Sequence, residues 1–346
     1  MDLPIISYRD PLLSIFILVS IIFVVSYSNY LWGKFKRKEE KKEIDNFIDN
    51  FTLPTGKQNY QLLLENHPES IESLKMLAPI YLKNGDFEES IVIYLALLEK
   101  LSAKEERLTL LGELGDAYQK AGFLHRSRDI YLEAIKLKSR SPRLLENLLI
   151  IYERLKEYTN ALDVIASLEE LKSEELHERG FIEAMIIIEY TKSTTEQKVE
   201  ALATHLIRYP YTAHVALGFI FKHSPGTAWG LLPHVDETQL LDIFWSLKKE
   251  DVDFSALKNR YLQAIFAAKG WCEAPKEEYL FELTLLSKLD KNYDQADLDF
   301  EYICDECKQI FPIFFHRCPS CHEVGSVVIE PMIGKRQLVA SYELFS

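Results

Sequence analysis

Apolar side chains recur at helical spacing through the middle of the chain, and the pattern repeats. Three segments align without gaps: LAPIYLKNGDFEESIVIY at 77–94, LGDAYQKAGFLHRSRDIY at 114–131 and LLIIYERLKEYTNALDVI at 148–165. Their starting points are 37 and 34 residues apart. Apolar positions three and four residues apart give each helix one face toward a core. The pattern therefore predicts antiparallel helix pairs that stack, because no single pair can bury its apolar face alone.

The three segments also share a turn position and a small position. Gly85, Gly122 and Lys156 occupy the turn, where glycine permits a left-handed backbone. Because lysine replaces glycine at 156, we expect a distorted third turn. The small position, which lets the second helix approach closely, is held by Ser90, Ser127 and Ala161. The pattern resembles the tetratricopeptide repeat, whose period is 34 residues. We expect such repeats over 70–172 and degenerate helical pairs over 173–298.

An uncharged apolar stretch precedes the repeats. Residues 12–32 form a run of 21 without a charge, long enough as a helix to cross about 30 Å of hydrocarbon. Six lysine and arginine residues follow within 34–42, whereas Arg9 alone is basic before the run. The positive-inside bias predicts an inner-membrane anchor at 1–33 with a periplasmic N-terminus, a basic helical linker at 34–69 and a cytoplasmic remainder. A cleaved signal peptide, the alternative, would need a basic n-region and a small-residue cleavage site.

Composition narrows the classes of function. The chain has 346 residues, 47% of them hydrophobic and 27% charged, which is typical of a folded protein. Its net charge of −13 argues against a nucleic-acid partner, since phosphate binding needs clustered lysine and arginine. No Walker, Rossmann or kinase signature interrupts the helical pattern. Serine, histidine and carboxylate residues are scattered, so we expect no catalytic residues and no enzyme.

Four of the five cysteines form two Cys-x-x-Cys pairs separated by ten residues. They are Cys304, Cys307, Cys318 and Cys321. Two such pairs supply four soft ligands in tetrahedral geometry, which predicts one bound metal ion. We expect zinc, with iron as the alternative. Two disulfides would conflict with the cytoplasmic side, and His316 and His322 are alternative ligands only if a thiolate is not used.

The segment 299–346 is too small to fold on its own core. Metal binding should therefore contribute to its folding. Between the cysteine pairs, the apolar run IFPIFF at 310–315 favours a β-type strand. Its aromatic side chains predict that the module docks on the helical array.

These parts together resemble the lipopolysaccharide assembly protein B family. The resemblance rests on YICDECKQIFPIFFHRCPSCHEVGSVVIEP at 302–331 and on LGDAYQKAGFLHRSRDIY, which is similar to that family's LGxxYxxAGLxxRAxxxY unit. It implies a mainly α fold with a single N-terminal transmembrane helix, a tetratricopeptide-type α-solenoid and a small C-terminal rubredoxin-like four-cysteine module. After Cys307 the family usually has glycine, whereas this chain has Lys308, so we expect strain in the first knuckle.

The resemblance implies a non-enzymatic regulator of lipopolysaccharide synthesis at the bacterial inner membrane. The implied partners are the membrane protease FtsH and lipopolysaccharide-synthesis proteins, among them the deacetylase that commits material to lipid A. The residues alone reach a membrane-tethered helical scaffold with a metal clip. A rubredoxin-type electron carrier, a scaffold for another membrane complex and a nucleic-acid-binding ribbon are the alternatives. A homo-oligomer stays open.

Overall fold

The computed structural model describes residues 54–190, 192–255, 257, 259–276, 279–289 and 296–335. The predicted anchor and most of the predicted linker therefore lie outside the described residues. Within those ranges, no helix is both long enough and apolar enough to cross a membrane. The chain divides into two compact units, 1–123 and 124–346. The domain boundaries expected from the sequence stay predictions.

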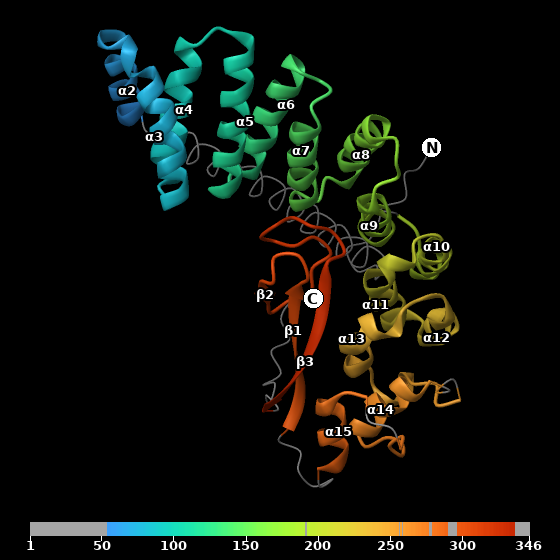
Figure 1. Cartoon of the computed structure of the whole chain (residues 1–346). Coiled ribbons are helices and arrows are strands. Elements are labelled where there is room, and N and C mark those ends of the chain that lie inside the picture. Colours follow the sequence, from blue (N-terminus) through green and yellow to red (C-terminus); the bar gives the residue numbers. More distant parts are fainter. Residues whose placement is uncertain are drawn as a thin grey trace, which may run out of the picture. The chain divides into compact units, whose positions relative to one another are not determined.

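The described part of the first unit is helical (Figure 1). Its helices are α2 (Pro54–Asn66), α3 (Ile71–Asn84), α4 (Phe87–Lys100) and α5 (Lys104–Lys120). Helix α4 packs against the other three and supplies most of the core. Ile93, Tyr94 and Leu97 are each at most 1% exposed. Burying an aliphatic or aromatic side chain of this size contributes about 1.5–3 kcal/mol, so α4 is the central helix of this unit.

The turns that end α3, α5 and α7 (Pro142–Arg154) are built alike. Each has a left-handed residue, with φ of 89° at Gly85, 84° at Gly122 and 58° at Lys156. The next amide then donates to a tyrosine carbonyl five residues back, at 2.9, 2.9 and 2.8 Å. The expected distortion of the third turn is therefore wrong. Lys156 adopts the glycine conformation because these hydrogen bonds satisfy helix carbonyls that would otherwise lack partners.

The second unit continues with helices along most of its length (Figure 1). They are α6 (Leu124–Leu137), α7, α8 (Tyr158–Lys172), α9 (His177–Met185), α10 (Thr195–Arg208), α11 (Ala213–His223), α12 (Pro225–Leu231), α13 (Leu241–Ser246), α14 (Arg260–Ala268) and α15 (Phe281–Lys288). Neighbours in sequence pack in pairs, including α7 with α8 and α10 with α11. The predicted mainly helical architecture is confirmed for the described residues.

Local sequence sets the ends of these helices. Helix α10 begins with a capping box, in which Thr194 and Gln197 exchange side-chain and backbone hydrogen bonds. It ends at Arg208, two residues before Pro210, as the sequence predicts. Pro225 opens α12, where its missing N–H costs no helical hydrogen bond.

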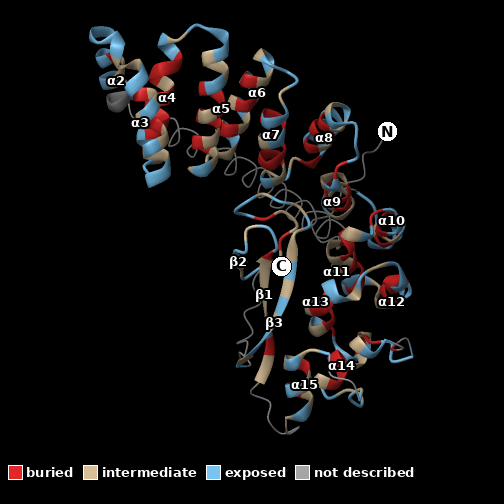
Figure 2. Cartoon of the chain, viewed as in Figure 1, coloured by how far each residue is buried: buried red, intermediate tan, exposed pale blue. Residues whose placement is uncertain are grey.

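An aromatic core lies between α11 and α14. Phe221, Trp229, Phe244 and Phe266 are each at most 5% exposed, and their rings contact one another at centroid distances of 5.4–6.1 Å. The Trp229 indole N–H donates to a backbone carbonyl at 2.8 Å, so burial leaves this donor satisfied. Figure 2 shows the buried positions concentrated on these helices rather than on β3.

The chain ends in a three-stranded antiparallel sheet with strand order β2–β1–β3. The strands are β1 (Ala296–Cys304), β2 (Ile310–Phe311) and β3 (Val327–Lys335). One face packs on the helices: Leu298 is 4% exposed and belongs to the same core as Phe244. The expected strand at 310–315 is only two residues long. Pro312 follows it directly and has no N–H to continue the ladder.

Candidate metal centre and its contacts with the helices

The two Cys-x-x-Cys turns have the same backbone hydrogen bonds. In the first, the Cys304 amide donates to the Gln309 carbonyl at 3.0 Å, and the Lys308 amide donates to the Cys304 carbonyl at 2.8 Å. In the second, over 318–323, the corresponding distances are 2.8 and 3.0 Å. The two knuckles are therefore structural equivalents that present their cysteines in the same way.

The residue after each knuckle's second cysteine has a left-handed backbone. The φ angle is 57° at Lys308 and 66° at His322. For a residue with a Cβ this conformation costs about 1–2 kcal/mol. The expected strain at Lys308 is confirmed, and His322 shares it. Both residues adopt the conformation because their amides must turn back to the first cysteine's carbonyl.

The four thiols of these knuckles converge on one point. Their sulfur atoms all lie within 4.8 Å of one another. The Cys304 and Cys321 sulfurs are 3.6 Å apart, and the Cys307 and Cys318 sulfurs are 3.7 Å apart. A zinc ion with four thiolates at about 2.3 Å would place neighbouring sulfurs about 3.8 Å apart. All four cysteines are free thiols rather than disulfides, and neither His316 nor His322 belongs to the cluster.

The charge state of the cluster favours a bound cation. Burial alone would raise the pKa of Cys304, but the amides of Cys307 and Glu306 and the Ser326 hydroxyl outweigh it and lower the pKa to about 6. At Cys321 the Glu323 amide lowers the pKa, yet the neighbouring thiols raise it to about 12. One thiolate therefore forms readily, whereas four close together need a positive ion to offset their repulsion.

The donor set thus fits one tetrahedral ion of the zinc or iron type. Four convergent thiols are the ligands that both ions accept, and the backbone donors around Cys304 would stabilise thiolate charge. Among the described residues, these cysteines are the cluster of Cys, His and carboxylate side chains whose spacing suits a metal. Bound metal would close the module by joining its two knuckles.

A buried ion pair joins the second knuckle to α7. The Arg317 guanidinium donates from Nε and Nη2 to the two carboxylate oxygens of Glu153, both at 2.7 Å. The two side chains are 11% and 7% exposed. Arg317 also donates from Nη1 to the His322 carbonyl at 2.9 Å, so it connects the knuckle backbone to the helix. This planar two-bond geometry is the strong form of an ion pair.

The ion pair fixes the charge of both groups. Burial raises the pKa of Glu153, but hydrogen bonds from Arg317 and His316 outweigh it, so the pKa lies below its usual range. For Arg317, burial lowers the pKa and the Glu153 carboxylate raises it above its usual value. Both groups are therefore charged at neutral pH. Removing either one would leave a buried, uncompensated charge.

A second contact links the module to α11 and α13. The ring of Phe314 stacks on His214, with centroids 3.4 Å apart and planes 7° apart. Asp242 then accepts hydrogen bonds from His214 Nε2 at 2.8 Å and from the Tyr302 hydroxyl at 2.9 Å. His316 adds a ring contact with Phe181 of α9 at 5.5 Å. Figure 1 shows the sheet on the side of these helices.

The predicted docking of the module is confirmed, although only part of the predicted surface takes part. Phe314, Phe315 and His316 face inward, whereas Ile310 and Ile313 are 56% and 75% exposed. The sequence had singled out the whole run at 310–315. Only its second half, together with Arg317, reaches the helices.

Sequence reasoning did not identify the helix residues that receive the module. Glu153, His214 and Asp242 come from α7, α11 and α13, and nothing local distinguishes them from surface residues. One signal was available. Glu153 follows the repeat tyrosine at a position that the other two copies fill with Leu82 and Gln119, so an acidic residue there departs from the repeat.

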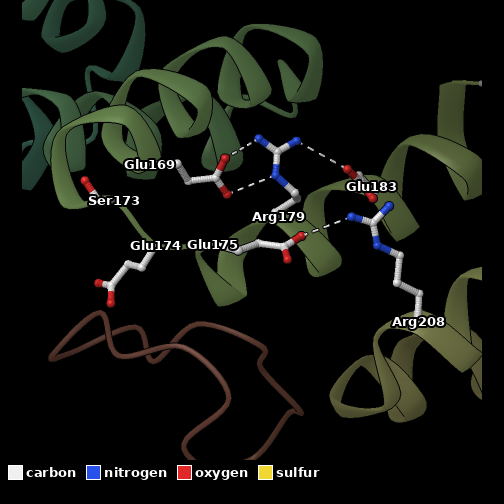
Figure 3. Close-up of a pocket in the computed structure, with 7 residues that line it drawn as sticks. All are labelled: Glu169, Ser173, Glu174, Glu175, Arg179, Glu183 and Arg208. Atoms are coloured by element: carbon white, nitrogen blue, oxygen red, sulfur yellow. Dashed lines mark hydrogen bonds and ion pairs between the residues drawn. The ribbon is translucent and has the colours of Figure 1, made fainter.

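Figure 3 shows a surface hollow of about 460 Å³ that is lined mainly by charged side chains. Glu169 binds Arg179, Arg179 also contacts Glu183, and Arg208 contacts Glu175 at 3.4 Å. These carboxylates are thus already paired. Ser173 is the one hydroxyl in the lining, and no histidine lines the hollow beside it as a base. The hollow therefore does not have the arrangement of a catalytic site.

Comparison with known proteins finds curated relatives of one name. Over 134 residues the chain is 24% identical to lipopolysaccharide assembly protein B of Haemophilus influenzae, covering 38% of this chain and 34% of the relative. It is 26% identical to the Escherichia coli K12 protein of the same name over 134 residues, covering 38% and 31%. The chain thus spans about a third of the length of the curated relatives it matches.

No protein-family model matches the chain. Among solved structures, it is similar to a tetratricopeptide repeat protein from Parabacteroides merdae, with 17% identity, a TM-score of 0.35, and coverage of 63% of this chain and 99% of that one. It is also similar to MamA MSR-1 C2, with 15% identity, a TM-score of 0.34, and coverage of 47% and 91%. The repeat assignment rests instead on the turns described above. The chain is thus related in sequence, over 38% of its length, to proteins named lipopolysaccharide assembly protein B.

Proposed function

We propose that this chain is a non-catalytic adaptor in lipopolysaccharide biosynthesis. The observation that carries the proposal is a buried, charge-paired metal module on a helical array, in a chain whose curated relatives are named for lipopolysaccharide assembly. Helical repeats present extended faces for binding proteins. A module fixed against them by Glu153 and Arg317 would hold that face in one shape.

The metal in this proposal is structural. Cys304, Cys307, Cys318 and Cys321 hold one ion, zinc in preference to iron, and the ion joins the two knuckles. An electron carrier would instead need iron that cycles between oxidation states. Metal analysis of protein produced in the cytoplasm, combined with a redox titration, separates these roles, because zinc does not cycle. Stoichiometric iron with a reversible potential would favour the carrier.

The proposed adaptor acts at the inner membrane. The uncharged run at 12–32 and the basic residues at 34–42 support a single-pass anchor with the bulk of the chain in the cytoplasm. A tether raises the effective concentration of membrane partners. The proposed partners are the protease FtsH and the deacetylase that commits material to lipid A, so that the adaptor restrains lipopolysaccharide output.

Depletion of the protein in its own bacterium tests this role. The deacetylase and total lipopolysaccharide should both rise, measured by immunoblot and by lipid A quantification. Unchanged levels of both would contradict the proposal. Re-expression of the wild-type chain should restore both levels.

A crosslinking pull-down from membranes tests whether the module takes part. The variant Cys304→Ser with Cys307→Ser should lose its metal and its partner capture. Cys272→Ser is the matched control, since this cysteine lies outside the cluster, and it should keep both. Full partner capture by the double variant would make the metal module dispensable for the adaptor role.

A further inference from the structure

The face of the C-terminal sheet that points away from the helices has an uneven arrangement of side chains. Along each strand alternate residues share a face, and the cross-strand pairs fix which residues are neighbours. On the outward face Ile303 lies between Ile310 of β2 and Val328 of β3, which are 56% and 48% exposed. The three form an apolar row across the sheet at the end next to the metal knuckles.

Acidic residues follow this row. Glu301 is paired directly with Glu330, and Asp299 comes next along β1, opposite Met332. None of the three carboxylates forms an ion pair or hydrogen bond with another side chain in the described part of the chain. Like charges directly opposite each other destabilise a sheet. The face therefore carries a local electrostatic cost that no described residue offsets, and a cationic occupant would relieve it.

We propose that this outward face binds the basic run at 34–38 of the same chain. The occupant must combine an apolar side chain for the row with cations at spacing that suits Asp299 and Glu301, which are two residues apart on one face. The run reads KFKRK, so Phe35 is flanked by lysines at alternate positions. In an extended segment alternate side chains point to the same side about 6.6–6.8 Å apart, which is also the spacing along β1.

The pairing has a consequence for the whole protein. The run at 34–38 follows directly after the predicted membrane span, so its binding would hold the metal module next to the bilayer. The contact depends neither on the identity of the metal nor on the proposed role in lipopolysaccharide synthesis. Its failure and the failure of that role are therefore separate outcomes.

A photo-crosslinking experiment on the full chain tests the contact. The chain carries Phe35→p-benzoylphenylalanine and is reconstituted in nanodiscs of uncharged phosphatidylcholine, so that anionic lipid does not compete. After irradiation, mass spectrometry locates the attachment. We expect attachment to the peptides containing Ile303, Ile310 or Val328. The reagent inserts into C–H bonds, so the yield reports proximity rather than the presence of a carboxylate.

Charge variants show whether the acidic face directs the contact. Glu301→Gln with Glu330→Gln should lower the attachment yield about three- to tenfold, the effect of losing two exposed ion pairs. These substitutions remove a repulsion, so the module should stay folded, and cysteine-to-metal stoichiometry checks this. Glu174→Gln with Glu200→Gln is the control at two exposed acidic residues elsewhere in the same unit and should leave the yield unchanged.

Mixing isotopically heavy and light chains completes the test. Attachment within one chain supports the proposal. Attachment only between heavy and light chains would overturn it in favour of a contact between two copies. Attachment to lipid or to other helices, or a yield that the two glutamate substitutions leave unchanged, would also overturn it.

Discussion

Hydrogen-bonding demands of turns override residue preference at several positions in this chain. Lys156, Lys308 and His322 all have the left-handed backbone that glycine adopts most easily. In each case the amide at or after that residue donates to a carbonyl left without a partner by the preceding turn, at 2.8–3.0 Å. The hydrogen bond offsets the conformational cost, so a non-glycine residue at such a position does not by itself signal a distorted turn.

Exchange of glycine and other residues at these turns should shift stability in opposite directions. Lys156→Gly relieves about 1–2 kcal/mol of backbone strain, partly offset by about 0.5–1 kcal/mol of chain entropy. We expect the free energy of unfolding to rise by up to about 1 kcal/mol. Gly85→Ala at the equivalent turn should lower it by about 1 kcal/mol. Urea titrations followed by circular dichroism measure both, and a loss of stability in Lys156→Gly would contradict this account.

The same strain at the first knuckle should affect metal retention. Lys308→Gly leaves the ligands unchanged and removes the left-handed lysine. A gain of about 1 kcal/mol corresponds to a roughly fivefold tighter metal site. Competition with a chromogenic chelator measures the affinity. Lys335→Gly, a substitution at the end of β3, is the control and should not tighten the site.

At the scale of elements, α7 and the second knuckle form the critical junction. Sequence periodicity predicted α7, and cysteine spacing predicted the knuckle, yet neither pattern indicated that Glu153 and Arg317 would meet. The two residues are 164 positions apart. Helical period and ligand spacing are local properties, whereas this ion pair depends on how the intervening helices α8 to α15 bring the chain back.

Breaking this pair should release the module from the helices. Glu153→Gln leaves the Arg317 charge buried, which costs about 3–5 kcal/mol for a pair of this kind. We expect faster hydrogen exchange in β1 and around Arg317, measured by mass spectrometry. Glu170→Gln removes an exposed ion pair with Arg140 and should leave exchange at the module unchanged. Equal exchange in both variants would mean that the aromatic contacts alone hold the module.

The contribution of Glu153 should also depend on pH in one direction. Its pKa is lower in the folded chain than in the unfolded chain, so the unfolded state binds the proton more readily. The stabilisation is therefore present above the unfolded value of about 4.3 and is lost as the pH falls through the folded value. The stability difference between wild type and Glu153→Gln should be constant from pH 6 to 8 and shrink below about pH 4. A difference that grew in acid would contradict this sign.

At the scale of the whole molecule, the metal and the second unit's core are linked. Leu298 of β1 belongs to the core that contains Phe244, while Cys304 at the other end of β1 belongs to the metal cluster. A strand that is shared between a core and a metal site transmits the loss of one to the other. The metal would therefore stabilise more of the chain than its own knuckles.

Removal of the metal tests this link. Incubation with a strong chelator should increase hydrogen exchange in β1, β3 and the part of α11 around His214. Helices α3 and α4 of the first unit should keep their exchange rates and serve as the internal reference. Re-addition of zinc should restore protection. Increased exchange confined to the two knuckles would show that the core holds β1 without the metal.

The sequence by itself determined the helix pairs, their turns, the end of α10 at Pro210 and the four cysteines that converge, because helical period, turn chemistry and ligand spacing act over a few residues. Only the tertiary structure decided that Phe314 to Arg317, rather than the whole run from Ile310, reach the helices, and that Glu153, His214 and Asp242 receive them. Which surfaces meet depends on the summed packing of all intervening helices, and no short stretch of sequence contains that sum.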